Sequence, residues 1–178
     1  MENVIVFMIC AALTIFGVMT LSNGFLSSVD TSAAGLKEME QRDSDIIKTN
    51  LALVSARQTA ADALEITLRN SGQTKLSDYP RWDVIVQYAG ADNATNIRWL
   101  PFNAGIVTEN EWMVQGIFLN AVEASPEIFD PGILNNGEEM IMGVKLSPPV
   151  KPDTINLVVV TAPNGARATG TFTGYRPG

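Results

Sequence analysis

The chain has 178 residues, a net charge of −7 and a pI of about 4.5. These values argue against a nucleic-acid partner, because phosphate binding needs clustered lysine and arginine, and the sequence has no basic run. The chain contains one cysteine and no histidine. It therefore has no internal disulfide, no cysteine-based metal site of its own and no histidine general base, so an enzyme is not expected.

The first predicted element is the apolar segment MENVIVFMICAALTIFGVMTL, residues 1–21. It carries no charge from Val4 to Leu21, a stretch of eighteen residues. A helix of that length rises about 27 Å, close to the ~30 Å hydrocarbon layer of a bilayer. Three interpretations are open. They are a cleavable secretory signal, a permanent membrane anchor, and the N-terminal helix of a processed chain that waits in the membrane and then packs into a polymer.

The charges around this segment favour the third interpretation. A secretory signal begins with basic residues and has a shorter apolar region, whereas the charge ahead of this segment is Glu2. An anchor is normally oriented by lysine or arginine beside the span, and the first basic residue here is Lys37. Removal of a basic leader would explain both observations. We therefore expect a processed helix that is finally buried among copies of itself.

Helical periodicity continues beyond a possible kink at Ser22-Asn23-Gly24. From residue 27 to residue 54, apolar residues that include Leu51 and Val54 follow one stripe at about 100° per residue. We predict that residues 1–54 form a long helix that packs against sister helices in a filament core. A membrane span followed by a soluble stalk is the alternative. The residues expected to make the helix contacts are Val4, Ile5, Phe7, Ile9, Leu13, Ile15, Phe16, Val18, Leu21, Phe25, Val29, Leu36, Met39, Ile46 and Ile47.

After about residue 55 the pattern changes to the period of two that is typical of strands. Strands are predicted at 63–70, 81–88, 96–100, 112–119, 139–146, 154–161 and 166–173. Turns are expected at Asn70-Ser71-Gly72-Gln73 and at Ala162-Pro163-Asn164-Gly165. This spacing predicts an antiparallel, immunoglobulin-like β-sandwich over residues 55–178, so the predicted fold class is α+β.

We find no catalytic, cofactor or metal-binding motif in the strand-rich part. The acidic residues Glu138, Glu139, Asp92 and Asp130 match no calcium loop and are predicted to form a solvated acidic surface. The three tryptophans, Trp82, Trp99 and Trp112, lie in strand patterns and are predicted to pack in the core. Asn93-Ala94-Thr95 is a sequon, so Asn93 is a possible N-glycosylation site if the domain is exported.

Three segments of the chain resemble archaellins, the type IV pilin-like filament subunits of the archaeal flagellum. They are MENVIVFMICAALTIFGVMTLSNGF, EITLRNSGQTKL and GVKLSPPVKPDTINLVVVTAPNGARATGTF. Bacterial type IV pilins usually have a glutamate at mature position five, where this chain has Ile5, and many close a C-terminal disulfide loop. The single cysteine, Cys10, cannot form such a loop, so the resemblance is to archaellins rather than to pilins.

The resemblance implies the major structural subunit of a helical extracellular filament used for swimming motility, without enzymatic activity or a cofactor. The helix would lie in the filament core and the sandwich would face solvent. The implied partners are copies of the chain itself, a prepilin-type peptidase that removes a basic leader, and a membrane assembly and motor platform. The stator-type accessory proteins of the archaeal flagellum also join an N-terminal helix to an immunoglobulin-like domain. A membrane-anchored stator-type or adhesive surface protein is therefore the alternative.

Overall fold

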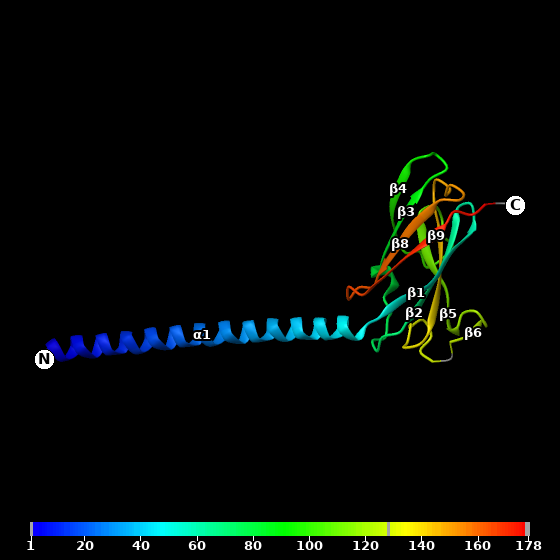
Figure 1. Ribbon diagram of the computed structural model, residues 1–178. Coiled ribbons are helices and arrows are strands. Elements are labelled where there is room, and N and C mark those ends of the chain that lie inside the picture. Colours follow the sequence, from blue (N-terminus) through cyan, green and yellow to red (C-terminus); the bar gives the residue numbers. More distant parts are fainter. Residues whose placement is uncertain (1, 128, 177–178) are drawn as a thin grey trace. The chain divides into compact units, whose positions relative to one another are not determined.

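The computed structural model describes residues 2–127 and 129–176. The chain divides into two compact units, Met1–Ser44 and Asp45–Gly178. The first unit belongs to a long helix, α1 (Glu2–Lys48), and the second contains the strands (Figure 1). The predicted fold class, a long N-terminal helix followed by an antiparallel β-sandwich, is confirmed.

Helix α1 runs through Ser22-Asn23-Gly24 without a break. Its hydroxyl side chains bond to the helix's own backbone, as Thr14 donates to the Cys10 carbonyl oxygen at 2.7 Å and Thr20 donates to that of Phe16 at 2.7 Å. A hydroxyl that bonds four residues back needs no partner outside the helix. The polar residues of the N-terminal half therefore do not interrupt its apolar surface.

The helix ends at Lys48, earlier than predicted. The prediction that residues 51–54 continue the helix is wrong, because they begin strand β1 (Leu51–Ala60). Leu51 pairs with Asn70 of the neighbouring strand, and its side chain is buried in the sandwich core. The helical spacing of Leu51 and Val54 is thus overridden by tertiary burial, which local periodicity does not report.

Two antiparallel sheets form the second unit. The first sheet has the strand order β1-β2-β7-β5-β6 and the second has the order β4-β3-β8-β9. The remaining strands are β2 (Ala63–Asn70), β3 (Asp83–Ala89), β4 (Thr95–Leu100), β5 (Glu111–Asn120), β6 (Ser125–Pro126), β7 (Glu139–Lys145), β8 (Ile155–Thr161) and β9 (Arg167–Thr173), and a short 3-10 helix, η1 (Tyr79–Arg81), precedes β3. All seven predicted strands are present, and β1 and β6 were not predicted.

The core lies between the two sheets and is built from alternate residues of each strand. On β2, Leu64, Ile66 and Leu68 are buried, and the corresponding positions of β3 and β7 are buried as well. The predicted period of two is thus confirmed on these strands. Trp82 and Trp112 are almost fully buried, as predicted.

The prediction that Trp99 packs in the core is wrong. Its side chain is 58% exposed on β4, an edge strand of the second sheet. Trp99 pairs with Ile85 of β3, and both side chains lie on the outer face of that sheet, because the alternate residues Leu100 and Val84 are buried inside. A one-residue step along a strand exchanges the inner and outer faces.

Asn70 organises the loop that follows β2. Its buried side chain donates from Nδ2 to the carbonyl oxygens of Thr74 at 2.8 Å and Leu134 at 2.9 Å, and its Oδ1 accepts from the Gly72 amide at 3.1 Å. The backbone of the same loop is bound to the segment that precedes β1, since the Gln73 amide donates to the Lys48 carbonyl oxygen at 2.6 Å.

Gly72 lies so close to this segment that a side chain has no room. An added Cβ would fall against the Asn50 nitrogen and within 2.5 Å of the Lys48 carbonyl oxygen. We expect Gly72→Ala to lower the free energy of unfolding by about 1–3 kcal/mol, because backbone atoms would have to shift. Gly105→Ala is the matched control, since the nearest atom to its Cβ is Asn103 Oδ1 at 3.5 Å. Urea denaturation measures both, and equal stability of the two variants would contradict the expectation.

Candidate assembly surface

The large apolar side chains of α1 form an extensive exposed surface. Every described member of the predicted contact set, from Val4 to Met39, is between 47% and 77% exposed. The side chains of Ile46 and Ile47, the last two members, lie outside the described residues. Such contiguous apolar surface is not stable against water, so α1 requires a covering environment.

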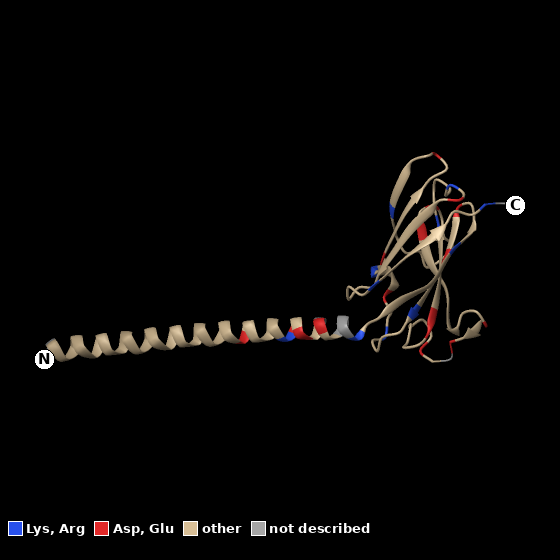
Figure 2. Ribbon diagram, viewed as in Figure 1, with Lys and Arg blue, Asp and Glu red and all other residues tan. Residues whose placement is uncertain are grey.

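This apolar surface surrounds the N-terminal half of α1. Phe7, Phe16 and Phe25 are spaced by nine residues, which places successive rings on opposite sides of a helix. No charged residue occurs from Asn3 to Val29. Figure 2 shows the acidic and basic residues of α1 gathered toward its C-terminal part. A helix that is apolar on all sides is surrounded on all sides, either by lipid or by other helices.

The length of the uncharged stretch can be compared with the thickness of a bilayer, since lipid and other helices are the two possible surroundings of α1. The segment Asn3–Gln41 is long and apolar enough to cross a bilayer, and none of its most apolar part is buried. The 27 uncharged residues from Asn3 to Val29 rise about 40 Å, whereas a hydrocarbon layer needs about 30 Å. Exposed Leu36 and Met39 extend the apolar surface further.

The β-sandwich carries a second exposed apolar surface, which the sequence analysis missed. On the outer face of the second sheet, β8 presents the exposed Ile155 and the half-buried Leu157 and Val159, which alternate with the buried residues Asn156, Val158 and Val160. The signal is present in the strand sequence INLVVVT, in which both faces are apolar. A strand with one face in water normally alternates apolar and polar residues.

Asn93, the predicted glycosylation site, lies in the turn between β3 and β4. It is exposed, has a positive φ of 63°, and its Oδ1 accepts a hydrogen bond from Lys151 Nζ at 2.8 Å. Its place on an exposed turn allows access to an enzyme. Glycosylation at this position stays a prediction.

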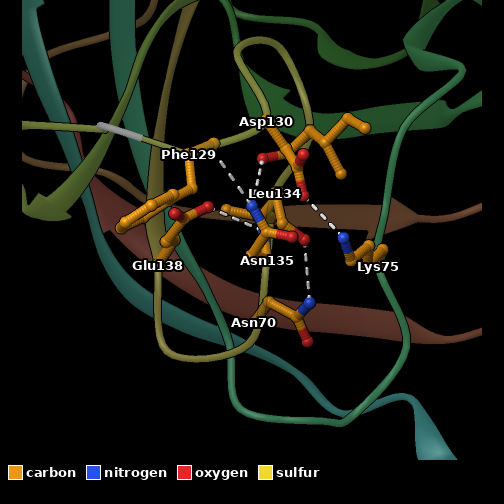
Figure 3. A network of polar contacts seen from close by, with 8 residues as sticks. Asn70, Lys75, Phe129, Asp130, Leu134, Asn135 and Glu138 are labelled. Atoms are coloured by element: carbon orange, nitrogen blue, oxygen red, sulfur yellow. Dashed lines mark hydrogen bonds and ion pairs between the residues drawn. The ribbon is translucent and has the colours of Figure 1, made fainter.

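The prediction of a solvated acidic surface is wrong for Glu138 and Glu139, which are only 4% and 6% exposed. Both carboxylates accept hydrogen bonds from loop backbone, with Glu138 bonded to the Asn135 amide at 2.7 Å and Glu139 to the Ala121 amide at 2.9 Å. Figure 3 shows Glu138 beside Asn135, and Asp130 facing Lys75 in an ion pair of 2.5 Å.

Among the described residues, no group of three or more potential protein ligands could hold a metal ion.

Glu127 lies in the same loop region, and its carboxylate is poorly satisfied by hydrogen bonds. Its Oε1 is buried without a hydrogen-bond partner among the described residues, and its Oε2 accepts a long bond from the Gly132 amide at 3.4 Å. Burial raises the pKa of the Glu127 carboxyl, and the nearby carboxylates of Glu138 and Asp130 raise this pKa further. Burial, followed by the charge of Glu127, also raises the pKa of Tyr79 to about 12.

Because the pKa of Glu127 is raised, we predict that a neutral side chain at this position increases the stability of the protein at neutral pH but not at acid pH. A carboxyl whose pKa rises on folding holds its proton more tightly in the folded state, so stability falls as the pH rises from the unfolded value of about 4.3 through the folded pKa. We expect Glu127→Gln to raise the Tm at pH 7 and to leave it unchanged at pH 3. The exposed Glu123→Gln is the control, with no expected change. A lower Tm for Glu127→Gln at pH 7 would contradict this account.

The fold of this chain is similar to that of solved structures. A chain of the archaellum periplasmic stator protein complex FlaF and FlaG from Sulfolobus acidocaldarius is 19% identical and matches with a TM-score of 0.52. The match covers 70% of this chain and 89% of that chain. Archaeal flagellin FlaB1 from Methanocaldococcus jannaschii is 13% identical, and its match has a TM-score of 0.53 and covers 72% of this chain and 93% of that chain.

The fold is that of archaellum proteins. No protein-family model and no curated protein sequence matches the chain. This fold occurs both in an archaeal flagellin and in a periplasmic stator complex, so the fold alone does not distinguish the predicted function from its alternative.

Proposed function

We propose that this protein is a structural subunit of an archaellum-type helical filament, in which α1 packs into the filament core and the β-sandwich faces solvent. The observation that carries the proposal is the exposed apolar surface all around α1. The buried apolar residues that the structure describes all lie between Leu51 and Phe172, so the core of the sandwich is built without residues of α1. The helix is thus free to pack against other copies of itself.

The pattern of α1 supports packing against helices over its whole length. The uncharged stretch is about 10 Å longer than a hydrocarbon layer requires. Beyond it, the apolar Leu36 and Met39 alternate with charged residues such as Lys37 and Glu40. An apolar stripe on an otherwise charged helix is typical of contact with one neighbour, which lipid does not explain.

The energy of burial makes such assembly feasible. The twelve large apolar residues from Val4 to Leu21 are each worth about 1.5–3 kcal/mol on full removal from water, or roughly 18–36 kcal/mol in total. Association costs about 4–15 kcal/mol in lost freedom of motion. The gain is smaller for a helix that leaves lipid, so assembly at a membrane platform would require an external energy source. A prepilin-type peptidase would release the helix from its leader.

One observation favours the alternative, a membrane-anchored stator-type or adhesive surface protein. The most apolar part of α1, Val4–Leu21, rises about 27 Å, which fits a single membrane span. In that case the sandwich would act as a binding module outside the membrane. The filament proposal places α1 among other helices, and the alternative places it in lipid. Separation of filaments from the membrane fraction therefore distinguishes the two functions.

The test is the location of the full-length chain on the surface of cells that produce it. We expect mass spectrometry to find the chain in shed filaments, and electron microscopy to show that these filaments are absent from cells that lack its gene. Mass spectrometry of the same material also tests Asn93, since Asn93→Gln would remove any glycan mass. A chain found only in the membrane fraction would reject the filament proposal and support the alternative.

A further inference from the structure

The outer face of the second sheet carries a group of exposed and half-buried apolar side chains. Six side chains make it, and we call it the tryptophan face: Ile85, Ile97, Trp99, Ile155, Leu157 and Val159. Strand register places them together, since Ile85 lies between Trp99 and Val159, and Gln87 lies between Ile97 and Leu157. Their exposed area is roughly 500 Å², at the upper end of the apolar patches found on monomeric proteins.

The tryptophan face has a negative group at its border. Asp83 Oδ1 accepts a hydrogen bond from Trp99 Nε1 at 2.9 Å, which holds the exposed indole in one orientation beside a carboxylate. On the other side, β9 contributes Thr169 and Thr171, which pair with Val159 and Leu157. The face therefore offers apolar surface, an ordered aromatic ring and one negative charge.

A groove of about 450 Å³ lies on the outer side of the first sheet. Its lining includes the apolar residues Val54, Val122 and Ile141, the ion pair of Arg57 with Glu65, whose atoms are 2.6 Å apart, and a second carboxylate, Glu139. Val122 is 92% exposed at the turn after β5, and the Arg57 side chain is 69% exposed despite its ion pair. The groove therefore offers apolar surface and an exposed guanidinium that is paired with a carboxylate of the same strand pair.

We propose that the tryptophan face of one copy docks into this groove on the next copy. Apolar residues line both surfaces, and Arg57 of the groove would meet both the indole of Trp99 and the carboxylate of Asp83. A guanidinium over an indole ring is a favourable contact when water is excluded. The face would bury roughly 500 Å² on each partner, about the 1,000 Å² in total at which specific interfaces begin.

The partner proposed for the groove is a second copy of the chain, because the face that would fill it belongs to the same chain. A contact between two different patches does not pair copies about a two-fold axis, and it extends into an open helical polymer when the rotation does not close a ring. This inference rests on the proposed function, which brings β-sandwiches side by side at high local concentration. The tryptophan face and the groove would then be the lateral contact between neighbouring sandwiches.

The test uses residues 45–178, which retain every residue of the buried core. Sedimentation equilibrium at millimolar concentration should show self-association of the unmodified fragment. Ile97→Lys damages the face and Val122→Lys damages the groove, so each variant alone should lose at least tenfold in affinity. An equal mixture of the two should form heterodimers and nothing larger, because it retains one intact face and one intact groove. Ile106→Lys, at an exposed residue outside both surfaces, is the control and should associate as the unmodified fragment does.

Three results would overturn the inference. They are a fragment that stays monomeric at millimolar concentration, a mixture of Ile97→Lys and Val122→Lys that does not pair, and association that is lost in Ile97→Lys but kept in Val122→Lys. The last result would indicate a symmetric contact between two tryptophan faces. Thermal unfolding of each variant establishes that it is folded. The fragment lacks α1, so absence of filaments from the full-length chain would count against the proposed function alone.

Discussion

Replacing Leu13 with glutamate should abolish polymer formation by the full-length chain. Leu13 lies within the uncharged stretch of α1, and its side chain is exposed. In a bundle of identical helices each copy would bury a carboxylate without a partner, at a cost of several kcal/mol per ion. The penalty recurs in every subunit. Sedimentation and electron microscopy of the full-length chain after detergent removal measure the effect.

Leu13→Met is the matched control, because it nearly conserves volume and adds no charge. Exchange of similar apolar residues usually costs less than about 1.5 kcal/mol, so this variant should still polymerise. Filaments formed by Leu13→Glu at the level of the unmodified chain would mean that this position does not lie in a packed helix core.

Replacing Trp82 with alanine should cause a large loss of stability in the β-sandwich. The side chain is 1% exposed, its ring lies 5.4 Å from that of Tyr79, and its Nε1 donates to the Ser77 carbonyl oxygen at 2.9 Å. Loss of a buried aromatic ring typically costs about 3–5 kcal/mol, a large part of the about 5–15 kcal/mol that stabilises a domain. Urea denaturation of residues 45–178 gives the free energy of unfolding directly.

Trp99→Ala provides the comparison for Trp82→Ala, because the same atoms are removed from an exposed site. We expect a loss below about 1 kcal/mol when the fragment is dilute and monomeric, since surface substitutions have small effects. Equal losses for the two tryptophans would show that the outer face of the second sheet is covered within a single copy. The predicted difference therefore tests both the core and the exposed surface.

Strands with a clean alternation were predictable from the sequence. Leu64, Ile66 and Leu68 alternate with polar residues, and burial follows this alternation because successive strand residues point to opposite faces. Strand β1 was missed because LALVSARQTA lacks this pattern and continues the helical stripe. What decides its conformation is pairing with β2 and burial of Leu51, neither of which local periodicity contains.

Buried polar residues were the least predictable part of the fold. Asn70 was predicted as a turn residue, yet its side chain bonds to Leu134, 64 residues away. Glu138 and Glu139 were predicted on a solvated surface, yet they bind loop amides that the fold brings to them. Composition predicts that carboxylates are exposed, and only the three-dimensional arrangement supplies the donors that allow their burial.

The candidate assembly surface on α1 was predictable, because a helix that is apolar on all sides is evident from residue order alone. The tryptophan face was not predicted, since the sequence does not say which strand lies at a sheet edge. Trp99 illustrates this limit, because its place in a strand pattern suited a core residue equally well.

The most direct test of the account uses Cys10, the single cysteine, which lies on the exposed surface of α1. A nitroxide label at Cys10 reports the distance to labels on other copies, and packed helices lie about 8–10 Å apart. Strong dipolar coupling between labels in assembled full-length chains, in material free of phospholipid, is the predicted result. Labels that are magnetically isolated, with each helix surrounded by lipid, would contradict the claim that α1 is buried among copies of itself.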